Sequence, residues 1–124
     1  MIDFVNGKTI KLSQVKTTEY DKLLSPLFAS GESSIAAFQT VRDGVVFTNK
    51  RIFAINIQGA IGKKKSIASL PYSKIQAFQI ETSGVFDVDG ELALWFANLG
   101  KVHFEFSGNS NLTEICRIIS AYSL

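Results

Sequence analysis

The chain has 124 residues, of which 46% are hydrophobic and 19% charged, and its formal net charge is +2. This size and composition describe one globular domain and exclude a disordered chain or a second core. The mild charge argues against a nucleic-acid partner, which a strongly basic surface would attract. The single cysteine, Cys116, excludes an internal disulfide framework. We find no stretch of membrane-spanning length and no signal peptide, so we expect a cytoplasmic protein.

The first 30 residues predict an N-terminal arm followed by an amphipathic helix. Residues 1–10 show little pattern, whereas apolar residues recur at three- and four-residue steps over residues 12–28. Pro26 and Gly31 should end this helix. Its apolar stripe must be buried, either on its own domain or against a neighbouring subunit; the stripe comprises Tyr20, Leu23, Leu24, Leu27 and Phe28.

Residues 35–58 predict a meander of three short strands, which organises the rest of the chain. Two tight turns separate the strands, at Arg42-Asp43-Gly44 and Thr48-Asn49-Lys50. Gly and Asn tolerate the positive φ that such turns require. Between the turns, β-branched and aromatic residues suit a half-buried sheet.

Four further strands are predicted at residues 63–70, 74–82, 91–97 and 101–107. The last of them alternates most cleanly between apolar and polar residues. We therefore expect Phe104 and Phe106 to point between the sheets. A C-terminal helix follows, for which Asn111 and Glu114 form a capping box. Its apolar stripe comprises Leu112, Ile115, Cys116, Ile119 and Tyr122.

Seven antiparallel strands followed by one amphipathic helix resemble the pleckstrin-homology (PH) architecture. More specifically, the chain is similar to the bacterial PH-domain family in its turn motifs, which are Val41-Arg42-Asp43, Phe47-Thr48-Asn49-Lys50-Arg51, Gly62-Lys63-Lys64, Pro71-Tyr72-Ser73 and Phe86-Asp87-Val88-Asp89. The resemblance implies a mainly β fold, a partly open barrel of seven strands in two nearly orthogonal sheets.

On this reading residues 1–124 form a single PH-like domain. Residues 1–30 supply the arm and the extra helix, residues 32–107 the barrel, and residues 110–122 the helix that plugs it. The resemblance also implies ring-like homo-oligomers and no assigned activity.

One basic cluster could bind an anion. In phosphoinositide-binding PH domains, basic residues from the first two hairpins converge on the lipid headgroup, and here Arg42, Lys63, Lys64 and Lys65 occupy those turns. However, the first turn is too short to build that pocket, and three lysines near an anionic membrane contribute only about 3 kcal/mol. A solvated strand end is the alternative interpretation.

Other chemistry-bearing residues have structural explanations. Asp87 and Asp89 lack the spacing of a calcium loop, and His103 beside Glu105 has the pattern of a surface pair. Cys116 is expected to act as a small hydrophobe, while Trp95 and Tyr72 suit packing more than a ligand platform. We therefore expect no catalytic residue, metal site or cofactor.

The leading functional hypothesis is a non-catalytic PH-like module that acts through homo-oligomerisation and protein–protein contacts, with an unidentified protein as a further partner. Two stretches, residues 54–57 and 76–80, are expected at sheet edges and lack proline and lysine alike. The alternative is a peripheral membrane adaptor that binds anionic headgroups weakly through its basic turns.

Overall fold

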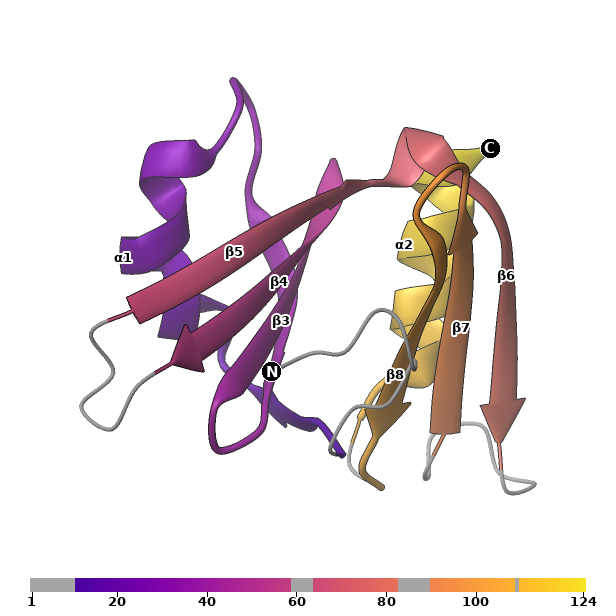
Figure 1. The fold of residues 1–124 in the computed structure, drawn as a ribbon, viewed down its shortest axis with the longest axis horizontal. Coiled ribbons are helices and arrows are strands. Elements are labelled where there is room, and N and C mark those ends of the chain that lie inside the picture. Colours follow the sequence, from indigo (N-terminus) through magenta and orange to yellow (C-terminus); the bar gives the residue numbers. More distant parts are fainter. Residues whose placement is uncertain (1–10, 59–63, 83–89, 109) are drawn as a thin grey trace.

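The computed structural model describes residues 11–58, 64–82, 90–108 and 110–124. Eight strands in this part of the chain form two antiparallel sheets, as predicted for a mainly β fold (Figure 1). The five-stranded sheet has the order β1 (Ser13–Val15), β2 (Ser34–Gln39), β3 (Asp43–Thr48), β4 (Arg51–Gln58) and β5 (Lys64–Pro71). The three-stranded sheet has the order β6 (Ile75–Thr82), β7 (Gly90–Phe96) and β8 (Gly100–Phe106).

The main core joins the inner faces of both sheets to the C-terminal helix α2 (Leu112–Ser123). Aromatic rings make the contact between the sheets: Phe38 of β2 meets Phe106 of β8 edge-on, with 4.9 Å between ring centroids. Phe104 and Phe106 are both fully buried, which confirms the predicted inward face of β8. Edge-to-face packing of this kind adds to the stabilisation from burial alone.

The predicted helix over residues 12–28 is wrong in its first part. Ser13–Val15 forms strand β1, and the helical part consists of a 3₁₀ turn, the short helix α1 (Asp21–Leu24) and a second 3₁₀ turn, Ser25–Leu27. The spacing of Leu12 and Val15 gave a false helical signal. The two side chains in fact enter different apolar clusters, Leu12 the main core and Val15 a second cluster outside the five-stranded sheet.

The segment from Leu12 to Val15 joins the two sheets. The Leu12 N–H donates to the Glu105 carbonyl oxygen (2.8 Å) and the Ser107 N–H donates to the Leu12 carbonyl oxygen (2.8 Å), after which β1 pairs with β2. This side of the barrel is thereby closed by an eighth strand that the sequence did not indicate. On the opposite side, β5 and β6 belong to different sheets and diverge (Figure 1). We call the outer edges of β5 and β6 together the seam.

One of the two predicted edges is wrong. Residues 54–57 lie in β4, which pairs with β3 on one side and β5 on the other. Residues 76–80 do lie in an edge strand, β6, whose neighbour is β7. Consecutive strands of a meander are flanked on both sides unless they come first or last, so β4 could not be an edge once β5 joined the same sheet.

Helix α2 begins at its predicted cap, with one difference. The Glu114 N–H donates to Asn111 Oδ1 (3.1 Å), but the Asn111 N–H donates to Gln14 Oε1 (3.1 Å) instead of to the glutamate. The buried stripe contains Leu112, Ile115, Ile118 and Ile119. Of the other predicted members, Cys116 is half-buried, and Tyr122 is 45% exposed although its ring stacks on Tyr72.

A buried ion pair attaches the segment after α1 to the five-stranded sheet. Arg51 Nη2 lies 2.7 Å from Glu32 Oε1, and the Glu32 side chain is fully buried. Glu32 also accepts hydrogen bonds from the Thr48 hydroxyl (2.7 Å) and the Ala29 N–H (2.8 Å). Arg51 in turn donates to the Leu27 carbonyl oxygen (2.7 Å). Full satisfaction of this kind is what a buried charge requires.

Candidate functional site

The seam presents two strand edges of different character. β5 has an exposed lysine, Lys65, near its start and a proline, Pro71, at its end. β6 has neither lysine nor proline, and its outward side chains are small or polar: Ala77, Gln79 and Glu81 are all exposed. Each strand pairs with one neighbour among the described residues. An edge without such safeguards is a template for another strand.

The other two sheet edges of the described chain offer less to a partner. The edge of β8 is partly occupied, because Leu12 bonds to the backbone of Glu105 and Ser107. The remaining edge strand, β1, has three residues, and short edge strands are one of the ways in which proteins limit edge pairing. Backbone available for pairing is therefore concentrated at the seam.

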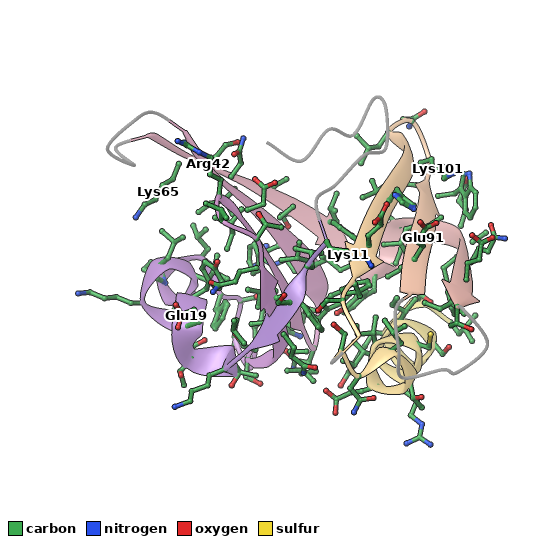
Figure 2. All side chains as sticks on the ribbon, turned by 90° about the horizontal axis from the view of Figure 1, so that it is seen from below. Lys11, Glu19, Arg42, Lys65, Glu91 and Lys101 are labelled. Carbon is green, nitrogen blue, oxygen red and sulfur yellow. The ribbon has the colours of Figure 1, made fainter. Side chains whose placement is uncertain are left out.

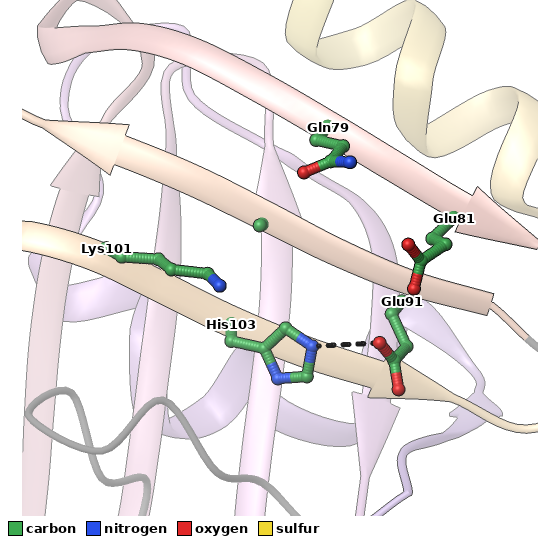
Figure 3. Close-up of a pocket in the computed structure, with 6 residues that line it drawn as sticks. Gln79, Glu81, Glu91, Lys101 and His103 are labelled. Atoms are coloured by element: carbon green, nitrogen blue, oxygen red, sulfur yellow. Dashed lines mark hydrogen bonds and ion pairs between the residues drawn. The ribbon is translucent and has the colours of Figure 1, made fainter.

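Beside the seam, the outer face of the three-stranded sheet carries a shallow hollow of about 100 Å³ (Figure 3). The hollow forms because Ala93 occupies the centre of a face on which its neighbours are long and polar. Its other lining residues are Gln79, Glu81, Glu91, Lys101 and His103, whose side chains extend to the same side of the sheet (Figure 3).

Three glutamates form a row across this face. Glu81 of β6 is directly opposite Glu91 of β7, which is directly opposite Glu105 of β8. Directly opposed side chains in an antiparallel sheet have Cβ atoms about 5 Å apart, and like charges there are destabilising. The row ends at the open edge with Glu81, so a cation next to β6 would be favoured at this position.

His103 lies within this face, but its partner differs from the predicted one. Its Nε2 is 3.4 Å from Glu91 Oε2, whereas we predicted a pair with Glu105. The residues that oppose His103 across the sheet are set by strand register, which spacing along one strand does not reveal. The Lys101 ammonium group lies 5.7 Å from the centroid of the Trp95 ring on the same outer face.

The stripe predicted as an oligomer interface lies on its own sheet. Leu24 is fully buried, and Tyr20, Leu23 and Phe28 pack with it against the outer face of the five-stranded sheet. The hydroxyl of Tyr20 donates to Gln39 Oε1 (3.2 Å), and burial, together with the nearby Glu19 and Asp43, raises the pKa of this phenol. Leu27 is 48% exposed. The stripe therefore does not by itself require a second subunit, and its role in an interface stays a prediction.

Two of the predicted anion-binding residues, Arg42 and Lys65, lie at one end of the five-stranded sheet. Figure 2 shows Arg42 and Lys65 on the same side of the molecule, as expected for neighbouring turns of a meander. Lys63 and the side chain of Lys64 lie outside the described residues. Asp43 follows Arg42 directly and is buried, so this end also contains a carboxylate, which disfavours a bound anion.

The remaining candidates are structural where they are described. Tyr72 is fully buried, its hydroxyl donates to the Thr48 carbonyl oxygen (2.8 Å), and burial raises its pKa. Burial also raises the pKa of the Cys116 thiol. Asp87 and Asp89 lie outside the described residues, and the described part of the chain holds no group of three side chains suited to a metal ion.

Comparison with known families matches this architecture. The family described as bacterial PH domain matches residues 3–123, nearly the whole chain. The chain belongs to the bacterial PH domain family. The match confirms the resemblance inferred from the turn motifs and the two-sheet fold with its C-terminal helix.

Relatives of this bacterial PH domain include both sequences and solved structures. Uncharacterized protein YjqA of Bacillus subtilis is 36% identical over 120 residues, covering 95% of this chain and 96% of the relative. A crystal structure of a DUF1696 family protein with a pleckstrin-homology domain from Shewanella loihica is 35% identical, with a TM-score of 0.79, covering 94% of this chain and all of that one. A pleckstrin homology domain from Shewanella amazonensis is 36% identical, with a TM-score of 0.66, covering 97% of this chain and 95% of that one.

The features at the seam of this bacterial PH domain were only partly predictable. The alternation of polar residues indicated the outward faces of β6, β7 and β8, but not that three glutamates share one row. In addition, no helix among the described residues is long and apolar enough to cross a membrane.

Proposed function

We propose that this bacterial PH domain is a non-catalytic assembly module, which acts through homo-oligomerisation and protein–protein contacts. The observation that carries the proposal is the seam, where β5 and β6 each have a neighbour on one side only in the described chain. The two edges differ in sequence, so pairing between copies would be heterologous, with β5 of one copy against β6 of the next. Heterologous contacts close into a ring when the rotation permits, and otherwise extend into a filament.

Strand pairing at the seam would satisfy backbone groups that otherwise depend on water. Each strand has eight residues, long for an edge. The proposal also accounts for the composition of β6, an edge strand that contains no lysine or proline to discourage pairing.

Sedimentation equilibrium over a wide concentration range tests the proposal. We expect a mass of several chains, with a single closed species if a ring forms. A mass of one chain at every concentration would overturn it.

A second candidate, the peripheral membrane adaptor, is favoured by one observation. Arg42 and Lys65 lie at the same end of the sheet, and Val41, at the tip of the turn there, is 97% exposed. Each basic residue near an anionic membrane contributes about 1 kcal/mol, so this pair supplies about 2 kcal/mol. Binding would be weak, salt-sensitive and indifferent to the headgroup.

Liposome sedimentation distinguishes this candidate. Arg42→Ala with Lys65→Ala should weaken any binding, whereas the control pair Lys22→Ala with Lys50→Ala, at exposed positions elsewhere, should leave it unchanged. Tight binding to one phosphoinositide at moderate salt would place the membrane function ahead of assembly.

A further inference from the structure

We infer that the hollow on the outer face of the three-stranded sheet is a docking site for an arginine side chain of a partner protein. The inference rests on the part of the proposed function that assigns protein–protein contacts to this domain, and it adds the chemistry of the partner. It does not depend on whether copies of the chain assemble with one another. Three properties of the hollow carry it: the distribution of charge, the hydrogen-bond acceptors available and the size.

The charge of this face is divided between its two ends. Lys101 is directly opposite Trp95, and its ammonium group lies over the Trp95 ring and forms no ion pair within the described chain. Glu105 is four residues further along the same strand, so its Cα atom lies about 13 Å away, at the end of the row that contains Glu81 and Glu91. Because like charges directly opposed across a sheet are destabilising, this row favours a cation from outside the sheet.

Acceptors for such a cation line the hollow. Glu81 is exposed and makes no hydrogen bond or ion pair within the described part of the chain, and the same holds for Gln79 on the same strand. Glu91 has one partner, His103, and its side chain is 44% exposed. Figure 3 shows these side chains extending to the same side of the sheet around the hollow. A ligand can therefore meet two carboxylates and a side-chain carbonyl oxygen, all of which accept hydrogen bonds.

The size of the hollow indicates one side chain as its occupant. Its volume is about 100 Å³, whereas pockets for small molecules and cofactors have volumes of roughly 300–1,000 Å³. The floor is apolar, because Ala93 occupies its centre. A guanidinium group is planar and weakly hydrated, which suits an apolar floor, and its fork of donors matches carboxylates. Glu81 and Glu91 are directly opposed, with Cβ atoms about 5 Å apart, so one guanidinium group can reach both.

Titration of the wild-type chain with N-acetyl-arginine amide, followed by NMR of the backbone amides, tests the inference. We expect saturable shifts at β6, β7 and β8 around the hollow, with a dissociation constant in the millimolar range. The corresponding citrulline compound has nearly the same shape without the charge and should bind about tenfold more weakly. The lysine compound should bind about threefold more weakly, because an ammonium group lacks the planar fork of donors.

Substitutions locate the binding. Glu81→Gln and Glu91→Gln should each weaken binding of the arginine compound about threefold to fivefold, since each removes one partly exposed charge. Ala93→Leu should abolish binding, because it fills the hollow. Glu19→Gln, at an exposed position of the N-terminal segment, and Ala77→Leu, at an exposed position of β6 outside the hollow, are the matched controls and should bind like the wild type. Circular dichroism checks that all variants fold.

Equal binding of the arginine and citrulline compounds would overturn the inference, as would arginine binding that neither Glu81→Gln nor Ala93→Leu changes. Tighter binding of the lysine compound would overturn the assignment to a guanidinium group. Failure of the proposed homo-oligomerisation is a separate result. A wild type that binds arginine and has the mass of one chain contradicts the assembly alone, whereas a wild type that assembles without binding arginine contradicts the docking site alone.

Discussion

The five-stranded sheet is covered on both faces, whereas within the described part of the chain the three-stranded sheet is covered on its inner face alone. The main core fills the inner face of each, and α2 contributes to that core. The outer face of the five-stranded sheet is additionally covered by the N-terminal segment, which buries Leu24 against Val46 and Phe53. The outer face of the three-stranded sheet instead carries Glu81, Glu91, Lys101 and His103, beside an edge strand with one neighbour.

This difference distinguishes a surface covered by the chain itself from one that the proposed function assigns to contacts with other chains. Apolar outer residues, such as Ile55, are those that a segment of the same chain covers. Polar outer residues and an edge strand without lysine or proline are the features of the surface through which, on the proposed function, a partner would bind. Substitutions on the two sheets should therefore have different effects, on stability for the covered faces and on association for the bare one.

The largest loss of stability is expected from a substitution in the core between the two sheets. Phe104→Ala should lower the free energy of unfolding by about 3–5 kcal/mol, because it leaves a cavity between the sheets. Chemical denaturation measures the change, with His103→Ala, one residue away on the outer face, as the control. If both variants lose the same free energy of unfolding, Phe104 does not lie on an inner face of β8 with His103 on the outer one.

The next effect concerns the ion pair that attaches the N-terminal segment. Glu32→Gln keeps the size of the side chain but removes its charge from Arg51, and should cost about 2–3 kcal/mol. If the free energy of unfolding falls by less than about 0.5 kcal/mol, the attachment of the N-terminal segment to the five-stranded sheet contributes little to the stability of the fold.

The same pair predicts a pH dependence. Burial alone would raise the pKa of Glu32, but hydrogen bonds from Arg51, Thr48 and Ala29, with the charge of Arg51, outweigh it and lower the pKa below 4.5. The unfolded chain therefore binds this proton more tightly than the folded chain, and the stabilisation is lost as the pH falls through the folded-state pKa. The difference in free energy of unfolding between the wild type and Glu32→Gln should be constant above about pH 5 and should shrink progressively below about pH 4.5.

A smaller loss of stability is expected from a substitution in β3 where the N-terminal segment packs against it. A Cβ atom on Gly44 would lie 2.6 Å from Cζ of Tyr20, so Gly44→Ala must displace that ring and should cost about 1–2 kcal/mol. In a Tyr20→Ala background the same substitution should cost less, because the obstruction is absent. Identical costs in both backgrounds would contradict this packing.

The smallest loss of stability is expected from a substitution on the outer face of the three-stranded sheet. Lys101→Ala removes a cation from above the Trp95 ring and should cost about 0.5 kcal/mol. A loss above about 2 kcal/mol, measured by denaturation, would show that this face is structural after all.

The contrast between the sheets also explains which features were predictable from the sequence. Alternation within a strand predicted the inward face of β8 and the polar face with Glu105, because side-chain direction depends on one strand alone. The closure by Leu12 was missed, because its three-residue spacing to Val15 also fits a helix. The row from Glu81 to Glu91 depends on register between strands separated by residues 83–89, which no local pattern determines.

Hydrogen–deuterium exchange at rising protein concentration tests the central claim most directly. If the seam is the assembly surface, backbone amides of β5 (Lys64–Pro71) and β6 (Ile75–Thr82) should gain protection together as the chains associate, while those of α1 (Asp21–Leu24) stay unchanged. Protection that grows with concentration in α1 and not in the two edge strands would contradict the account.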